Sequence, residues 1–239
     1  MDLSPQQIRN IVVGVFILLI SVALHEFGHA IAAYKLGDDT PKRQGRVTLN
    51  PLAHADPIGT LLLPVVGGIY SAASGIAGGF GWGKPVQWNP SRIRRGIKMS
   101  TATIIVSFAG PAMNLLLALV ITLTHAILAK SGVLELRVIS GHAILPSAVD
   151  AILYAAAATN FILFFFNLLP IPPLDGGHIA QSFTPYRHRE KFDAYARYGP
   201  FVLLGVMLIP QVRQVFSVPA SWCTDGLYSM FGALFGLGI

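Results

Sequence analysis

The sequence predicts an all-α polytopic membrane protein with about five to six transmembrane helices. Of its 239 residues, 53% are hydrophobic and 12% are charged, whereas about a quarter of the residues of a soluble domain are charged. The mean hydropathy is +0.60, and the apolar residues gather in stretches long enough to cross a bilayer. We therefore expect residues 1–239 to form a single integral-membrane domain.

The expected spans follow these apolar stretches in chain order. Three stretches are long, and two near the end of the chain are shorter. In order they are 8–36, 101–129, 147–169, 201–209 and 226–239. A short β-strand is expected near residues 45–49, in the loop that follows the first span.

Residues 58–80 are also apolar, but they contain six glycines and Pro64, which favour a broken path over a straight helix. Basic loops flank this segment at 35–57 and 81–100. A single crossing would place these loops on opposite sides of the membrane, against the tendency of Lys and Arg to stay in the cytoplasm. A re-entrant path would keep both loops on one side. The charge placement favours the re-entrant path, and a single crossing stays open.

The net charge of +6 could indicate binding to nucleic acid. The Lys and Arg residues instead cluster in short loops between apolar stretches, where positive charge sets membrane orientation. We therefore expect the lipid bilayer, and no nucleic acid, as a partner. The single cysteine, Cys223, excludes both an intramolecular disulfide framework and a cysteine-based zinc site.

The first apolar stretch carries the motif His25-Glu26-Phe27-Gly28-His29. On a helix, His25 and His29 lie on one face, one turn apart, so their imidazoles can bind the same Zn²⁺. Glu26 lies beside them and can accept a proton from a zinc-bound water. Such polar groups are costly inside a membrane, and their presence there indicates a functional site.

A catalytic zinc site takes three protein ligands and leaves one position for water. Asp175 is the best candidate for the third ligand because it follows the end of an apolar span. With a re-entrant 58–80 segment, Asp175 would lie at the same depth as His25 and His29. The sequence Asp175-Gly176-Gly177 is also typical of a turn, and local chemistry leaves both interpretations open.

These motifs resemble the site-2 protease family of intramembrane zinc metalloproteases. Its members combine an H-E-x-x-H helix with a distant N-x-x-P-x-x-x-L-D-G motif, which here are residues 25–29 and 167–176. Residues 45–59 and 110–114 are similar to stretches of the short bacterial members. The similarity covers about 12–178, and we expect a short bacterial-type member without a PDZ or CBS domain.

The resemblance implies a role for each motif residue. His25, His29 and Asp175 would bind one Zn²⁺ per chain, and Glu26 would be the general base. Asn167 would be a second catalytic residue, donating a hydrogen bond to the oxyanion that forms on the substrate carbonyl. A structural role at the end of a helix is the alternative for Asn167.

The resemblance also implies an intramembrane zinc metalloendopeptidase that hydrolyses peptide bonds within or beside transmembrane segments, as in regulated intramembrane proteolysis. Its substrate would be a transmembrane protein or peptide. The catalytic core would be about 8–178, followed by C-terminal helices at 199–239. We expect a multi-pass protein of the cell membrane with its active site near the cytoplasmic side. A metal transporter or sensor and an inactive scaffold stay open as other functions.

Several other residues carry structural expectations. His54 and Asp56 lie within the 45–59 stretch, where either metal contact or a structural role is open. Gly110 is expected to allow close helix packing. Pro172 and Pro173 should hold the backbone out of a helix just before the aspartate of the second motif.

Overall fold

The computed structural model describes residues 3–74, 81–139 and 141–237, and most of them are helical. The chain divides into two compact units, Met1–Gly110 and Pro111–Ile239. The first unit contains α1 (Pro5–Lys35), α2 (Thr40–Arg43), η1 (Pro51–Ala53), η2 (Pro57–Leu62), α3 (Leu63–Ser74), η3 (Pro90–Arg92) and the start of α4 (Met99–Lys130). The second contains the rest of α4, then β1 (Arg137–Ile139), β2 (His142–Ile144), α5 (Ala148–Asn167), α6 (Asp175–Phe183), η4 (Tyr186–His188), α7 (Arg189–Leu208) and α8 (Pro210–Phe235).

Helix α1 carries the whole H-E-x-x-H motif on one continuous helix, as the sequence predicts. It begins with a capping box, in which Ser4 Oγ accepts the Gln7 N–H and the Gln7 side chain accepts the Ser4 N–H. The apolar residues that follow sustain 31 residues of helix. Gly37 then adopts a φ of +113°, a conformation that favours glycine and that ends the helical path.

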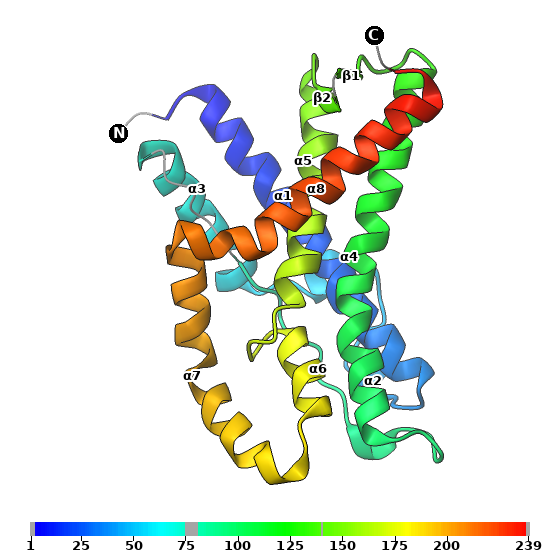
Figure 1. The fold of residues 1–239 in the computed structure, drawn as a ribbon, viewed down its shortest axis with the longest axis vertical. Coiled ribbons are helices and arrows are strands. Elements are labelled where there is room, and N and C mark those ends of the chain that lie inside the picture. Colours follow the sequence, from blue (N-terminus) through cyan, green and yellow to red (C-terminus); the bar gives the residue numbers. More distant parts are fainter. Residues whose placement is uncertain (1–2, 75–80, 140, 238–239) are drawn as a thin grey trace. The chain divides into compact units, whose positions relative to one another are not determined.

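The segment that begins at η2 runs back along α1 (Figure 1). The Gln7 side chain donates to the Ala72 carbonyl, and the bare backbone of Gly68 lies against Ile11. By Trp82 the chain has returned, because the Trp82 N–H donates to the Gly59 carbonyl at 3.1 Å. Gly59 near the start of the segment and Trp82 just after it therefore lie side by side, as a re-entrant path requires. Residues 75–80 of the predicted 58–80 segment lie outside the described residues.

The strand expected near residues 45–49 is not present, so that prediction is wrong. The polar groups of this stretch bind neighbouring loop residues instead of a partner strand. Thr48 shows the reason, since its carbonyl accepts from the His54 ring and its hydroxyl accepts the Asn50 N–H. The small antiparallel sheet of the protein lies elsewhere, where β1 pairs with β2 and Arg137 lies opposite Ile144.

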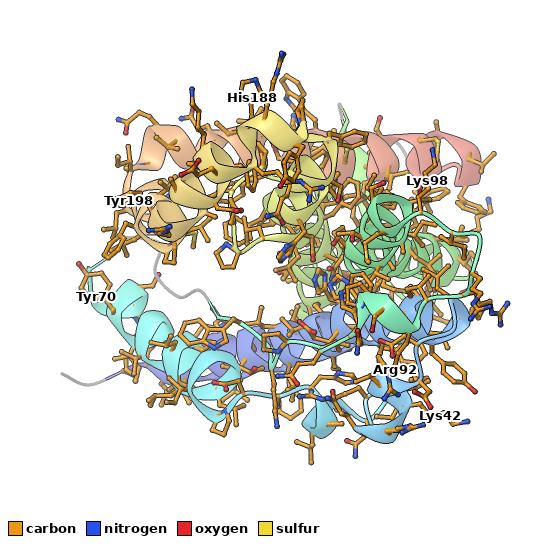
Figure 2. All side chains as sticks on the ribbon, turned by 90° about the horizontal axis from the view of Figure 1, so that it is seen from below. Lys42, Tyr70, Arg92, Lys98, His188 and Tyr198 are labelled. Carbon is orange, nitrogen blue, oxygen red and sulfur yellow. The ribbon has the colours of Figure 1, made fainter. Side chains whose placement is uncertain are left out.

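The loop after Trp82 is fixed to α2 by ion pairs at Asp39. One Asp39 oxygen contacts Arg92 and the other contacts Arg43, each at 2.6 Å. Figure 2 shows Arg92 and Lys42 at the same end of this unit. The hydrogen bond from Arg92 holds the pKa of Asp39 below its usual value, so the carboxylate stays ionised and the loop stays attached.

The second unit is built on α4, α5 and α8, with α8 crossing α5 (Figure 1). Apolar packing between them centres on Ala118 and Phe161. Nearby, a fully buried polar cluster joins all three helices: His125 Nε2 and Asp150 Oδ1 are 2.9 Å apart, and His125 Nδ1 is 2.9 Å from the Tyr228 hydroxyl. Because each buried polar group has a partner, the cluster fixes how these helices pack.

Helix α5 ends at Asn167, and α6 begins at Asp175. The intervening residues are not helical, which confirms the effect expected of Pro172 and Pro173. This loop then folds over the start of α6: a Cβ on Gly176 would overlap the Leu168 carbonyl, and one on Gly177 would come within 2.6 Å of the Pro172 nitrogen. The glycines that follow Asp175 are therefore required for close packing.

Three helices among the described residues are long and apolar enough to cross a membrane, namely α1, α4 and α5. A fourth span would result if Tyr186–Leu208 and Pro210–Phe235, which are bent by 81°, formed one broken span. The three long predicted spans are confirmed, but the total of five to six is not. Residues 201–208 and 226–235 of the two shorter predicted stretches, 201–209 and 226–239, are apolar ends of α7 and α8, whose remaining turns carry polar and charged residues. His188 and Tyr198 point outward from this polar part (Figure 2). Residues 238–239 of the second stretch lie outside the described residues.

Candidate metal centre

The imidazoles of His25 and His29 converge on the buried face of α1. Their Nε2 atoms are 3.0 Å apart, and the ring planes meet at 83°. The two residues are 8% and 9% exposed, so water has little access to compete for the ring nitrogens. Two imidazole nitrogens that converge in this way provide two of the three expected zinc ligands, as the motif spacing predicts.

The orientation of His29 is set by helix α4. Its Nδ1 lies 2.7 Å from the Val106 carbonyl, which can only accept a hydrogen bond, so Nδ1 carries the proton. The lone pair is then on Nε2, on the side that faces His25. A hydrogen bond of this kind fixes the tautomer and ring direction of many metal-binding histidines.

Gly110 lets both imidazoles lie directly against the backbone of α4. A Cβ at this position would overlap His29 Nε2 and would lie 2.8 Å from His25 Cε1. The expectation that Gly110 allows close packing is therefore confirmed, with the added detail that its neighbours are the two expected ligands. The backbone of α4 thus forms one wall of the metal centre.

The change Gly110→Ala is expected to lower zinc affinity at least about tenfold, as loss of a group that orients a ligand typically does. The added methyl must displace His29, whose ring is held by Val106. Zinc content per chain, measured after dialysis against a competing chelator, tests this expectation. Gly14→Ala is the matched control in α1, because a Cβ there meets no atom within 4 Å. A fully loaded Gly110→Ala protein would contradict the proposed position of the ion.

Glu26 is also buried, with 9% of its surface exposed. Its Oε2 accepts the Val86 backbone N–H at 2.9 Å. The backbone of Gly83 lies close as well, since a Cβ there would come within 3.3 Å of Glu26 Cγ. The carboxylate is therefore held in one orientation, one residue away from an expected zinc ligand.

Asn167 and Asp175 belong to the second unit, and their functional roles stay predictions. Asn167 is the last residue of α5, and its amide donates to the Leu163 carbonyl at 2.9 Å. This bond fits the helix-end alternative, and it uses one of the two amide N–H donors. Asp175 is the half-buried first residue of α6.

His54 and Asp56 have structural partners. His54 is fully buried, and its Nε2 donates to the Thr48 carbonyl. One oxygen of Asp56 accepts the N–H groups of Ile58 and Gly59, which caps the start of η2. Both residues therefore organise the loop before η2.

The arrangement fits a zinc ion: two imidazoles converge, Gly110 lets them lie against the backbone of α4, and the Glu26 carboxylate lies on the same helix beside them. This combination defines the metal-binding helix of an H-E-x-x-H zinc hydrolase.

Comparison with known proteins agrees with this class. The model of peptidase family M50 matches residues 13–209. The chain is 35% identical over 221 residues to the Bacillus subtilis protein named "Putative zinc metalloprotease YwhC", covering 92% of this chain and 91% of that protein. It is 34% identical over 223 residues to "Putative zinc metalloprotease Rip2" of Mycolicibacterium smegmatis, covering 89% and 75%. No solved structure matches the chain.

The chain therefore belongs to peptidase family M50, the site-2 protease family. It is a zinc metalloprotease embedded in a membrane, and Zn²⁺ is its metal.

Sequence reasoning missed two backbone groups of the site, the Val106 carbonyl and the Val86 N–H. Every residue has such groups, so no side-chain pattern could identify these two. The sequence Gly110-Pro111 was the one available signal, because glycine and proline inside an apolar span indicate an unusual backbone requirement.

Proposed function

We propose that this protein is an intramembrane zinc metalloendopeptidase that hydrolyses peptide bonds within or beside transmembrane segments of membrane proteins. In this proposal His25, His29 and Asp175 hold one zinc ion per chain. The observation that carries the proposal is the convergence of two buried imidazoles, with Glu26 beside them, on an apolar helix. Metal-assisted peptide hydrolysis needs such metal ligands and a carboxylate beside them.

Zinc, when bound, would supply Lewis acidity and would lower the pKa of a bound water to about 7. Glu26 accepts the proton of the attacking water and later delivers it to the leaving amine. Asn167 offers its second amide N–H to the oxyanion on the substrate carbonyl. The Val106 carbonyl holds His29 in the tautomer that can bind the metal.

Helices α1, α4 and α5 would cross the bilayer, and residues 58–80 would enter and leave it on one side. The bond between Trp82 and Gly59 supports this path, because it joins the start of the segment to the chain just after it. The basic loops on either side would then be cytoplasmic, which puts the active site near the cytoplasmic face. A substrate helix satisfies its own backbone in lipid, so it must unwind locally before it is cleaved.

A metal transporter or sensor could use the same three ligands. Glu26 favours hydrolysis over transport, because a transporter would have no use for a buried carboxylate held in one orientation beside the ligands. An inactive scaffold would have no need for the close approach that Gly110 allows.

Cleavage of a tagged single-span peptide by the full chain in detergent micelles tests the proposal. We expect cleavage within the apolar segment, loss of cleavage with a zinc chelator, and recovery on adding Zn²⁺ but not Mg²⁺. Mass spectrometry of the products locates the cut. Chelator-resistant cleavage would contradict metal-assisted hydrolysis, and zinc uptake into proteoliposomes without cleavage would favour the transporter.

A further inference from the structure

Residues 82–86, called here the strap, are neither helix nor strand and run past the Glu26 carboxylate. In an extended chain the N–H groups of alternate residues point the same way. The strap follows this rule: the N–H groups of Trp82 and Lys84 donate to the carbonyls of Gly59 and His54, at 3.1 Å and 2.9 Å. The third N–H in this series, that of Val86, donates to Glu26.

Two of the three strap contacts are made to residues 46–60, called here the support loop. This loop contains most of the stretch that resembles the short bacterial members of the family, and the zinc chemistry gives it no task. Its buried residue Thr60 accepts the Asp56 N–H at 2.9 Å and donates to the Trp82 carbonyl at 2.8 Å. The hydroxyl of Thr60 therefore fixes the first residue of the strap to a rigid turn.

Arg46 holds the middle of the strap. Only 6% of Arg46 is exposed, and its guanidinium donates to the carbonyls of Ala53 and Lys84. Ala53 lies in the support loop and Lys84 in the strap, so one side chain joins the two segments. A buried guanidinium is costly unless it is hydrogen-bonded, which indicates that this junction has a purpose.

The register of the strap is set by its own sequence. Pro85 lies between two donors and has no N–H, so a shift by one residue would place it opposite either Glu26 or the His54 carbonyl and would remove one of the bonds. Gly83 allows the approach, since a Cβ there would come within 2.5 Å of Val22 on α1. A shift of the strap by one residue therefore cannot keep all three bonds.

We infer that the strap is a positioning element for the general base, and that Thr60 and Arg46 are positioning residues that act through it. This inference rests on the proposed role of Glu26. The Val86 N–H holds one carboxylate oxygen of Glu26 in place, and the support loop holds the strap that carries Val86. The support loop thereby has a task in catalysis although it touches neither metal nor substrate.

The variants Val86→Pro and Val86→Ala separate the backbone donor from the side chain. Val86→Pro removes the N–H that binds Glu26, and Val86→Ala keeps it. We expect kcat of Val86→Pro to be about 100-fold below that of Val86→Ala, because misplacing a reacting group can lower the rate by this factor. KM for the tagged single-span peptide and zinc content should match between the two variants.

A second set of variants tests the support loop without changing the strap. Thr60→Val removes the hydroxyl that holds Trp82, whereas Thr60→Ser keeps it. We expect kcat to fall at least about tenfold in Thr60→Val and to recover in Thr60→Ser, with KM and zinc content unchanged. Thr224→Val is the matched control, because Thr224 is also fully buried and its hydroxyl donates to the Ala220 carbonyl of its own helix.

Equal kcat values within both pairs would overturn the inference, as would a loss in Thr60→Val that Thr60→Ser does not recover. If Val86→Pro does not fold, the threonine pair decides. The Glu26→Gln variant distinguishes failure of the inference from failure of the proposed function. If Glu26→Gln is inactive while Val86→Pro and Thr60→Val are fully active, only the proposed role of the strap is contradicted. If Glu26→Gln is active, the proposed function itself is contradicted.

Discussion

Glu26→Gln is expected to abolish cleavage of the single-span peptide while zinc stays bound. Glutamine has the same shape and can still accept the Val86 N–H, but it cannot take a proton from water. Loss of a general base typically lowers the rate about 10² to 10⁴-fold. Because Glu26 is buried, bulk solvent has little access to act in its place. Initial cleavage rate and zinc per chain are the two measurements.

Glu190→Gln provides the matched control, because Glu190 is exposed at the start of α7 and we give it no role in the reaction. Its activity and zinc content should equal those of the unchanged chain. Wild-type cleavage by Glu26→Gln would exclude Glu26 as the base. Loss of both zinc and activity would instead mean that Glu26 supports the metal.

Asp175→Asn is expected to remove both bound zinc and activity. The change keeps the side chain's shape but replaces an anionic ligand by a neutral amide, which binds Zn²⁺ poorly. Removing a group that merely orients a ligand lowers metal affinity about 10 to 100-fold, so removing a ligand should lower the affinity further. Competition with a chelator of known affinity measures the zinc dissociation constant.

Asp193→Asn is the control for this change, since Asp193 is exposed on α7 and accepts only the Gln181 side chain among the described contacts. Unchanged zinc affinity in Asp175→Asn would support the other interpretation of the Asp175-Gly176-Gly177 sequence, that of a turn at the start of α6. The zinc would then need a different third ligand, and the hydrolase proposal would lose its ligand set.

The three long helices and the position of the metal motif could be predicted because both depend on local sequence. Apolar stretches of sufficient length mark spans, and the four-residue spacing of His25 and His29 fixes their relative position on any helix. The shorter C-terminal stretches misled the count of spans. Their apolar residues continue into polar turns of α7 and α8, so hydrophobicity in a short window did not reveal the whole helix.

The strand expected at 45–49 shows a feature that local sequence alone does not determine. Thr48 and its neighbours suit a strand, but a strand needs a partner. Here the Thr48 carbonyl accepts from the His54 ring, and the Thr48 hydroxyl accepts the Asn50 N–H. Whether a partner is present depends on how distant segments meet.

The sequence by itself determined which residues we propose for the chemistry: two histidines one turn apart, with a glutamate between them, on an apolar helix. Only the tertiary structure decided how two of these groups are held. The Val106 carbonyl orients His29, the backbone of Gly110 leaves room beside it, and the Val86 N–H binds Glu26. The physical reason is that these contacts are made by backbone atoms, which are the same in every residue and become specific only through folding.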